Sequence, residues 1–445
     1  MIRGFLTLWI AMNFISDMVQ GQESIKLSLI DAVAMGLEQN YQLRIVVLQT
    51  SQAKNQNTWG MAGALPNLTA QSAGRYSKSE NNNPFNYITA VTNDNTYKSR
   101  SVSQALDLGW TLFNGFRVHA QKSKFGLIQQ QSLGNEQLVM ENTVQAIILS
   151  YYRVKVEEEK LDVLGQLLQL SGDRYKRSAQ KKKIGAKTTF EFLQDKNIYL
   201  TDSTNWISQK LVRKNALRSF NMLIAVSDDK TWELTDKLIY NEPDWKYNAL
   251  LDSMRSNNYN LKNQYLNLEV LKKDINIQRS QLYPRINFGL GLNYGDQKFE
   301  NAMGTGGGTS IDYYGNASLN FNMFNGGQVR KAIQNAQIQL NIGKVQLEEQ
   351  QHTLTNSLKQ FYEQFEARGH LFGISSENKE TALLNMKLAK EREGLGAISS
   401  FDLRDIQLRY LNASISSLEY LYQWFEAKLE VMRLSGQILK KNEPQ

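Results

Sequence analysis

The chain contains no cysteine among its 445 residues. It therefore has no disulfide, no thiolate metal site and no cysteine nucleophile, and a lipid on an N-terminal cysteine is not expected. Proline is scarce, with five residues, and histidine occurs three times. Beyond the N-terminus no segment has 18 consecutive apolar residues, so we expect no membrane-spanning helix.

The sequence shows few residues in patterns typical of catalysis, metal binding or nucleic-acid binding. Lysine and arginine give a net charge of +8, but they are spread along the chain, and no nucleic-acid-binding module surrounds the one tight run at 181–183. His119, His352 and His370 lie outside any metal motif, and the glycine-rich segment 304–310 lacks the Lys-Ser/Thr end of a phosphate loop. We therefore expect a non-enzyme without cofactor, metal or nucleic-acid partner, and interpret 304–310 as a flexible hairpin loop.

Residues 1–21 have the pattern of a secretory signal peptide. Arg3 precedes an apolar stretch, and Val19 and Gly21 are small enough for a cleavage site. The stretch is too short and too broken to span a bilayer as a helix. The alternative is an N-terminal helix of the mature protein. The signal predicts export.

The sequence contains a tandem duplication. "QNYQL" at 39–43 matches "NNYNL" at 257–261 with an offset of 218, and further along "IGAKTTFEFL" at 184–193 matches "LGAISSFDLR" at 395–404 with an offset of 211. One difference in loop length explains the change of offset. The expected organisation is a first repeat at 22–226, an inter-repeat segment at 227–247, a second repeat at 248–436 and a tail at 437–445.

Each repeat contains two expected strands with an alternating pattern. In "RINFGLGLNYG" the bulky apolar residues point one way, and asparagine and glycine point the other. This pattern is typical of membrane barrel strands, with lipid outside and water inside, although a half-buried soluble sheet alternates in the same way. The strands are expected at about 65–77 and 102–113 in the first repeat, and at about 284–295 and 311–324 in the second.

A long helical hairpin follows the second strand of each repeat. Each outgoing segment is free of proline for roughly 70 residues, which corresponds to about 100 Å of helix. The return helix of the second repeat has apolar residues at heptad spacing, which predicts packing against a neighbouring helix: Leu408, Leu411, Ile415, Leu418, Tyr422, Phe425, Leu429 and Met432. The hairpins are expected at about 114–223 and about 325–435.

The triplet Phe-Asn-Gly stands at both expected strand-to-helix junctions. Glycine tolerates the backbone conformation of such a junction, and asparagine can satisfy freed backbone groups. Four strands cannot close a barrel and open sheet edges are not tolerated in lipid, so we expect a ring of several chains with heterologous contacts. The residues concerned are Phe113, Asn114, Gly115, Phe324, Asn325 and Gly326, with Pro66 and Pro284 before the first strand of each repeat.

With these features the chain resembles the TolC family of bacterial outer-membrane efflux channels over roughly residues 25–436. The resemblance implies a homotrimer with a 12-stranded membrane β-barrel, four strands from each duplicated protomer, and a long α-helical barrel. It implies a position in the outer membrane of a Gram-negative bacterium, in contact with its lipid and projecting into the periplasm.

The function implied by the resemblance is the exit duct of a tripartite efflux or type I secretion system. Such a duct passively conducts drugs, small molecules or exported protein. Its partners would be a periplasmic adaptor (membrane fusion protein) and an inner-membrane transporter of RND or ABC type. The alternatives are a passive porin-like channel, and a periplasmic coiled-coil scaffold that never enters the membrane.

The resemblance also assigns roles near the hairpin tips. The family's latch arginine and its tyrosine partner fall at Ile398 and Glu393, so the familiar closed-state latch is absent from these positions. The adaptor-contacting tip motifs are Ile184, Gly185, Ala186 and Leu395, Gly396, Ala397, and the acidic residues of the periplasmic entrance are Asp402, Asp405 and Glu191.

Overall fold

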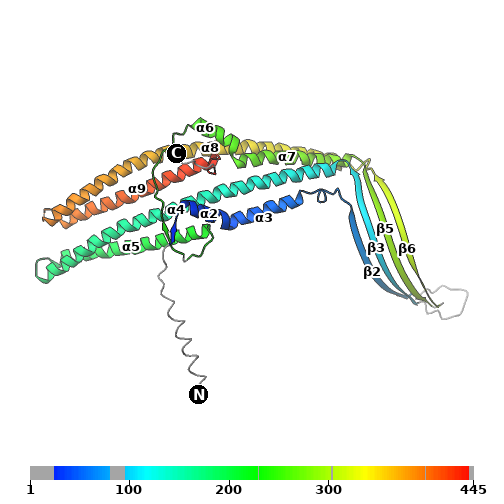
Figure 1. Ribbon diagram of the computed structural model, residues 1–445, viewed down its shortest axis with the longest axis horizontal. Coiled ribbons are helices and arrows are strands. Elements are labelled where there is room, and N and C mark those ends of the chain that lie inside the picture. The colour runs from blue at the N-terminus through cyan, green and yellow to red at the C-terminus, as the bar shows by residue number, and fades with distance from the viewer. Residues whose placement is uncertain (1–24, 81–95, 229, 302–303, 396, 440–445) are drawn as a thin grey trace, which may run out of the picture. The chain divides into compact units, whose positions relative to one another are not determined.

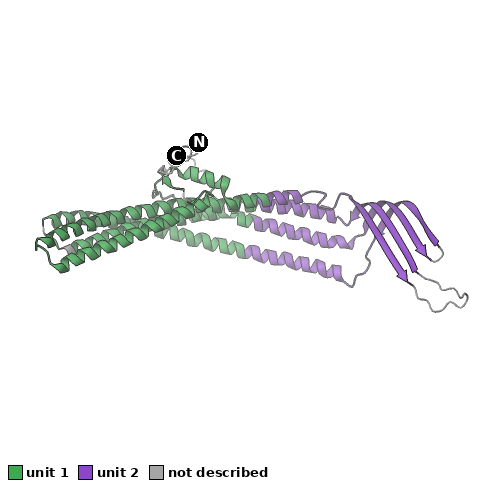
Figure 2. Cartoon of the chain, turned by 90° about the horizontal axis from the view of Figure 1, so that it is seen from below, with its two compact units in different colours: residues 1–48, 134–262, 349–445 green, residues 49–133, 263–348 purple. Residues whose placement is uncertain are grey.

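The chain divides into two compact units in the computed structural model, which describes residues 25–80, 96–228, 230–301, 304–395 and 397–439. The expected signal peptide lies outside these residues. Figure 2 colours the units separately. Unit 1 comprises residues 1–48, 134–262 and 349–445, and unit 2 comprises residues 49–133 and 263–348.

The helices of the two repeats match in length and position. The outgoing helices α4 (Arg117–Lys183) and α8 (Gln328–Gly394) have 67 residues each. The return helices α5 (Thr189–Leu223) and α9 (Ser400–Leu434) have 35 residues each. Every boundary repeats at the offset of 211, and Figure 1 shows the two hairpins. Helices this long owe their stability to packing along their sides, because helix propensity alone contributes little.

Helix α9 packs on two sides within unit 1. On one side Leu411 and Ile415 of the expected heptad seam meet Leu164 and Leu167 of α4. Leu408, expected in the same seam, is exposed, so the buried part of the seam begins at Leu411. On the side of α8, the ring of Trp424 lies 5.6 Å from that of Phe365. Leu403, Tyr410 and Ala427 of α9 are also buried.

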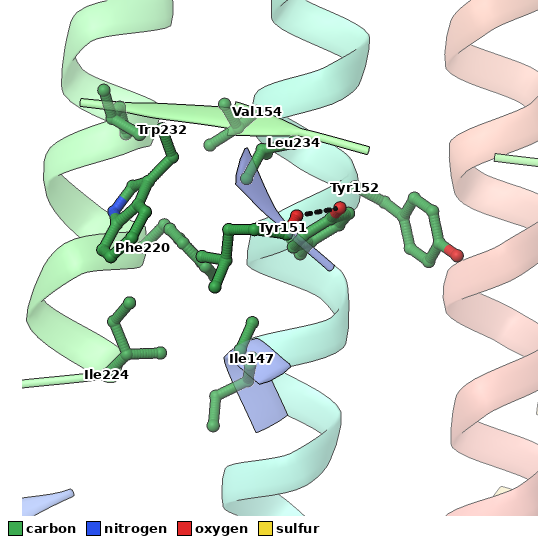
Figure 3. Close-up of a cluster of buried hydrophobic side chains, with 11 residues drawn as sticks. Ile147, Tyr151, Tyr152, Val154, Phe220, Ile224, Trp232 and Leu234 are labelled. Carbon is green, nitrogen blue, oxygen red and sulfur yellow. Dashed lines mark hydrogen bonds between the residues drawn. The ribbon is translucent and has the colours of Figure 1, made fainter. Parts of the chain in front are cut away.

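A hydrophobic cluster in the middle of unit 1 joins α4, α5 and two short strands (Figure 3). Strand β1 (Ile25–Leu27) pairs in parallel with β4 (Trp232–Leu234). The buried hydroxyl of Tyr151 donates to the carbonyl of Leu27 at 2.9 Å, so it ties this small sheet to α4. The cluster's other members include Ile147, Val154, Phe220 and Ile224.

Two asparagines perform the same structural role in both repeats. Asn40 follows α2 (Leu29–Gln39), and its amide donates to the carbonyl of Leu223 at 2.8 Å. Asn258 follows α6 (Tyr247–Asn257), and its amide donates to the carbonyl of Leu434 at 3.0 Å. Each asparagine also accepts a backbone N–H from the next helix, α3 (Tyr41–Gln56) or α7 (Tyr259–Arg279). The matched sequences thus form equivalent hydrogen-bonded contacts at the ends of the two return helices.

Unit 2 contains a four-stranded antiparallel sheet in the order β2-β3-β5-β6 (Figure 1). Its register places Leu106 opposite Leu292 and Leu108 opposite Leu290, so the apolar residues share one face as their alternation predicts. The opposite face carries small and polar residues. The strands are β2 (Asn67–Glu80), β3 (Thr96–Asn114), β5 (Arg285–Asn301) and β6 (Gly304–Asn320).

The strands differ from the expected ones at their far ends. Residues 304–310, expected as a flexible loop, belong to β6, where Gly306 pairs with Phe299. A β-carbon on Gly306 would lie 2.6 Å from the Phe299 ring, so this ring covers the backbone where the glycine has no side chain. In the other direction β6 ends at Asn320, earlier than expected, while β3 continues to Asn114 along β5.

Both Phe-Asn-Gly junctions lie between a strand and a long helix. Gly115 and Gly326 adopt left-handed backbone conformations with φ of +67° and +63°. The side chain of Asn114 accepts the N–H of Val118 in the first turn of α4, at 3.3 Å. Among the described residues, none of the helices is at once long enough and apolar enough to cross a membrane.

Candidate channel entrance and hairpin tips

The two hairpin tips of unit 1 end their outgoing helices with the same backbone bond. At the first tip the N–H of Ala186 donates to the carbonyl of Lys181, and at the second that of Ala397 donates to Arg392, both at 2.9 Å. This six-to-one bond belongs to the Schellman motif, which places a left-handed residue just before its donor. Gly185 fills that position with a φ of +72°. Gly396, the expected equivalent, lies outside the described residues.

Apolar side chains at the tips are strongly exposed. Ile184 is 78% exposed and Leu395 is 85% exposed. On the return helices, Phe190 and Phe401 are also largely exposed, at the same offset of 211. Both tips thus present large apolar side chains to solvent at matching positions.

Two of the expected entrance acids cap their own helices. Glu191 and Thr188 form a reciprocal capping box at the start of α5. The N–H of Thr188 donates to the Glu191 carboxylate, and with the Thr188 hydroxyl it lowers the pKa of this group. At the start of α9, Ser399 accepts the N–H of Asp402 and donates its hydroxyl to the Asp402 carboxylate at 2.6 Å. Both acids remain exposed to solvent.

The third expected entrance acid is paired along its own helix. Asp405 accepts a bond from Nε of Arg409 at 2.7 Å, and both side chains are exposed. An exposed pair at this spacing contributes about 0.5 kcal/mol or less to helix stability. The single chain therefore places Glu191 on α5 and Asp402 and Asp405 on α9, each with a local partner and none in contact with another.

A buried ion pair, which the sequence did not single out, joins the two hairpins near these acids. The guanidinium of Arg404 on α9 binds the carboxylate of Asp202 on α5 through two bonds of 2.7 and 2.9 Å. The Asp202 side chain is 4% exposed. Removing one partner of such a pair would leave an uncompensated buried charge, which costs about 3–5 kcal/mol.

More charged groups lie around this pair. Asp195, one heptad before Asp202 on α5, is buried and binds Lys187 of the tip. Arg174 of α4 is buried, and burial lowers its pKa against the opposing effect of Glu393 and Asp195. Glu393, at the position of the family's latch tyrosine, lies 3.8 Å from Arg177. The tip end of the hairpins is thus held by ion pairs between α4, α5, α8 and α9.

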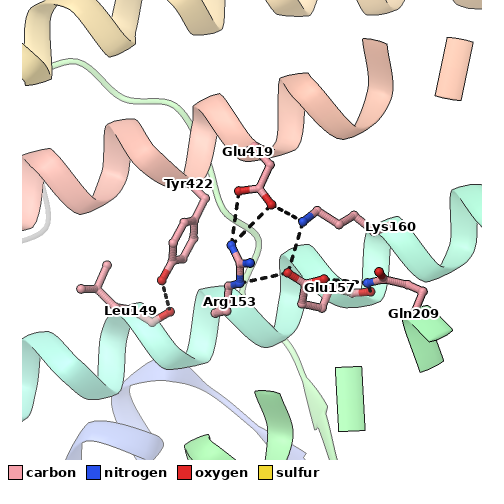
Figure 4. A network of polar contacts seen from close by, with 7 residues as sticks. All are labelled: Leu149, Arg153, Glu157, Lys160, Gln209, Glu419 and Tyr422. Atoms are coloured by element: carbon pink, nitrogen blue, oxygen red, sulfur yellow. Dashed lines mark hydrogen bonds and ion pairs between the residues drawn. The ribbon is translucent and has the colours of Figure 1, made fainter. Parts of the chain in front are cut away.

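A second polar cluster joins α4, α5 and α9 further along the hairpins (Figure 4). The buried carboxylate of Glu157 accepts bonds from Arg153 at 2.9 Å, Lys160 at 3.2 Å and Gln209 at 2.6 Å. Arg153 and Lys160 also bind Glu419 of α9. Burial raises the pKa of Glu419, but these two cations outweigh it and the net pKa is lowered. All the charged groups of this cluster are paired, and their bonds hold α4, α5 and α9 in a fixed position along one another.

A groove of about 730 Å³ lies between α8 and α9 near the second tip. Its walls include Asn385, Arg392, Ile398 and Arg409. The three histidines are exposed on helices, and no cluster of three metal-capable side chains is found in the described part of the chain. The recognisable features of the site are therefore exposed tips, ion-paired hairpins and acids at the start of the return helices.

Comparison with known proteins identifies a family model and several structures similar to this chain. Residues 250–437 match the family model "Outer membrane efflux protein". No curated protein sequence matches the chain. Among solved structures, the CmeC outer membrane channel of Campylobacter jejuni is similar, with a TM-score of 0.73 and 14% identity over 94% of this chain and 87% of that one.

Two further structures have the same fold. The outer membrane protein VceC of Vibrio cholerae gives a TM-score of 0.68 and 12% identity, over 92% of this chain and 96% of that one. The MtrE outer membrane channel of Neisseria gonorrhoeae gives 0.69 and 15%, over 94% and 91%. The family model for outer membrane efflux proteins thus matches the second repeat, and nearly the whole chain has the fold of these outer-membrane channels.

Proposed function

We propose that this efflux channel is the exit duct of a tripartite efflux or type I secretion assembly. A trimer receives cargo from a periplasmic adaptor and an inner-membrane transporter and conducts it passively outward. The exposed tips carry the proposal: Ile184 and Leu395 place apolar side chains in water at the ends of both hairpins. An adaptor that covers them gains the free energy of burying apolar surface.

The sheet supports the trimer. Its order leaves β2 and β6 with one unpaired edge each, and open edges are not tolerated in lipid. Pairing β6 of one chain with β2 of the next closes 12 strands in three steps, because the contact is heterologous. The 35-residue return helices disfavour a porin, which has short periplasmic turns, and the apolar sheet face disfavours a scaffold that stays out of the membrane.

The docking role is tested by enlarging the tips. Ala186→Trp/Ala397→Trp adds bulk at exposed positions without changing the glycine turns, so we expect export of cargo to be lost in cells while the purified trimer conducts normally in planar bilayers. Ala186→Ser/Ala397→Ser changes the same two positions but keeps small side chains; it is the control and should export normally. Full export by the tryptophan variant, with the trimer present in the membrane, would show that the tips do not dock.

The entrance role of Asp402, Asp405 and Glu191 is part of the same proposal. Three chains would place nine carboxylates near the periplasmic opening, and acidic rings favour cations. Asp402→Asn/Asp405→Asn should weaken block by a trivalent cation added on the periplasmic side in single-channel recordings. Because Asp405 is paired, Arg409→Gln should strengthen the block. Equal block in wild type and both variants would place the constriction elsewhere.

A further inference from the structure

Two cations lie directly opposite each other on the apolar face of the sheet. The register pairs Arg100 of β3 with Lys298 of β5. Tyr76 of β2 stands opposite Arg100, and Gly307 of β6 stands opposite Lys298. Directly opposed residues share one face and have β-carbons about 5 Å apart. The four strands thus contribute one row across the sheet: an aromatic ring, two positive charges and a glycine.

This row belongs to the apolar face. Between β3 and β5 the pairing runs without a shift from Trp110 opposite Phe288 to Lys98 opposite Glu300. Since side chains alternate with period two, Lys298 points to the same side as Phe288 and Leu292. The face that is apolar near the helices therefore becomes charged toward the far end of the strands, where Lys78, Lys98, Arg100 and Lys298 stand with Glu80, Asp296 and Glu300.

Arg100 and Lys298 have no ion-pair partner within the described residues, unlike the cations of the next row. There Lys98 lies 3.4 Å from Glu300, and Lys78 binds Glu80. Like charges directly opposite on neighbouring strands destabilise a sheet. Asp296, two positions from Lys298 on the same face, forms no ion pair with either residue. An anion placed between the two cations would relieve their repulsion.

The surface around the pair is hollowed. A cavity of about 1010 Å³ is lined on this face by Tyr76, Arg100, Lys298 and Gly307, and also by the carboxylates of Asp296 and Glu300, of which Glu300 is paired with Lys98. Glycine leaves one wall without a side chain. Arginine can bind a phosphate through two parallel bonds, and lysine adds a point charge, so the pair has the chemistry of a phosphate site.

The pair also lies at the level of lipid headgroups. From Leu290, in the middle of the apolar rows, to Lys298 the strand rises about 27 Å, or about 20 Å along the membrane normal at a tilt of roughly 40°. The hydrocarbon half-thickness is about 15 Å. Tyr294 lies between, about 10 Å along the normal by the same measure and therefore on the hydrocarbon side of that boundary.

We propose that Arg100 and Lys298 form a binding site for the phosphate of an anionic lipid in the outer leaflet, a phosphorylated glycolipid of the lipid A type. The site rests on the proposed function, since the channel orientation turns this face toward lipid and this end of the strands toward the outside. Each trimer carries three such sites. The occupant is a lipid rather than a free ion because the apolar rows continue from the phosphate site along the same face.

The test is native mass spectrometry of the detergent-solubilised trimer with added bisphosphorylated lipid A. Wild type should bind up to three molecules, and Arg100→Gln/Lys298→Gln should bind about tenfold more weakly. The control is Arg75→Gln, which removes a cation from the opposite face one row away and should bind as wild type does. Lipid A without phosphates should bind wild type as weakly as the double variant binds the complete lipid.

Three results would overturn the site: equal affinity in wild type and double variant, an equal loss in Arg75→Gln, or full displacement of lipid A by inorganic phosphate, which would indicate a free-ion site. Planar-bilayer conductance separates this from the channel proposal. If the channel conducts but the double substitution leaves its affinity for lipid A unchanged, the lipid site alone is refuted. A wild-type chain that forms no conducting channel refutes the proposed function and this site with it.

Discussion

The two Phe-Asn-Gly junctions have the same sequence and the same left-handed glycine, but very different surroundings. A β-carbon on Gly115 would lie 2.3 Å from the carbonyl oxygen of Ser280 and 2.8 Å from Cβ of Tyr283. A β-carbon on Gly326 would meet nothing within 4 Å. The first junction is packed by its own chain, whereas the second lies beside the unpaired edge strand β6.

This difference suggests which residues of a neighbouring chain could pack against the second junction. Ser280 and Tyr283 belong to the connection between α7 and β5, and the offset of 218 places Ala62 and Leu65 at the corresponding points of the first repeat. Within one chain, neither residue has an atom within 4 Å of a β-carbon on Gly326. In a closed ring of heterologous contacts, we expect Ala62 and Leu65 of the neighbouring chain to pack there, so that both glycines meet the same surroundings.

The largest effect is expected from Gly115→Ala. Alanine would have to adopt a φ of +67°, and its β-carbon would collide with a backbone carbonyl, which cannot move as a side chain can. We expect a loss of about 3 kcal/mol or more, visible as a lower midpoint of thermal unfolding by circular dichroism. Gly109→Ala in β3, where a β-carbon meets nothing, is the control. Equal midpoints for the two variants would contradict the packing at the first junction.

Gly326→Ala should act on assembly rather than on the chain itself. The left-handed conformation costs alanine about 1–2 kcal/mol, but no atom of the same chain obstructs it. We expect fewer trimers by sedimentation velocity. Gly327→Ala is the control, because Gly327 is also left-handed and its first-repeat equivalent is Phe116, so a side chain fits there. If the two variants trimerise equally well, no neighbouring chain packs on Gly326.

A smaller effect is expected at Glu141, whose second-repeat equivalent is the exposed His352. Burial raises the pKa of Glu141 to about 7, against the lowering effect of Arg433 and Lys262. Because the folded pKa lies above the unfolded one of 4.5, this group's stabilising contribution is complete below pH 4.5 and is lost as the pH rises through 7.

Replacing the buried acid tests this contrast. Glu141→Gln should raise the unfolding midpoint at pH 8 by about 2–4 °C and change it less at pH 5. His352→Gln, at the matching exposed position, should leave the pH profile unchanged. A Glu141→Gln profile parallel to that of wild type would show that this carboxyl titrates normally.

The smallest effect is expected from Phe116→Gly, which makes the first junction resemble the Gly-Gly of the second. Phe116 is strained at a φ of +65°, and glycine would relieve about 1 kcal/mol. Its ring, however, meets that of Phe113 at 5.3 Å and that of Tyr283 at 6.3 Å. Such contacts contribute a similar amount, so the net change in unfolding free energy should stay below about 1 kcal/mol. A loss above 2 kcal/mol would mean that the rings hold the junction.

The sequence predicts most of the fold because its signals are local and occur twice. The alternation of apolar and polar residues predicts the two faces of the sheet. The long segments without proline predict the long helices. The segment 304–310 was misinterpreted because glycine carries no side-chain pattern, and its strand conformation depends on pairing with β5, which is not a local property. The end of the buried seam at Leu411 likewise depends on which helices meet, which one helix alone does not show.

At the candidate site the predictable part is again the local part. The tip turns follow from glycine, and the caps at Glu191 and Asp402 follow from a Thr or Ser three residues earlier, a pattern that the sequence interpretation passed over. The Asp202–Arg404 pair joins residues 202 positions apart, so only the folded hairpins bring it together. The roles of the entrance acids and tips remain predictions that the conductance and export experiments decide.

The equal helix lengths of the two repeats constrain how this protein can change. Adding one residue to α4 alone would shift its tip by about 1.5 Å and turn every later side chain by about 100° around the axis. The ion pairs between the hairpins would then be out of phase, and the two hairpin tips would stand at different heights. Insertions and deletions should therefore be tolerated only as compensating sets of about seven residues, two helical turns, taken from all four long helices together. The length of the two helical hairpins is thus set jointly by both repeats and changes in discrete steps.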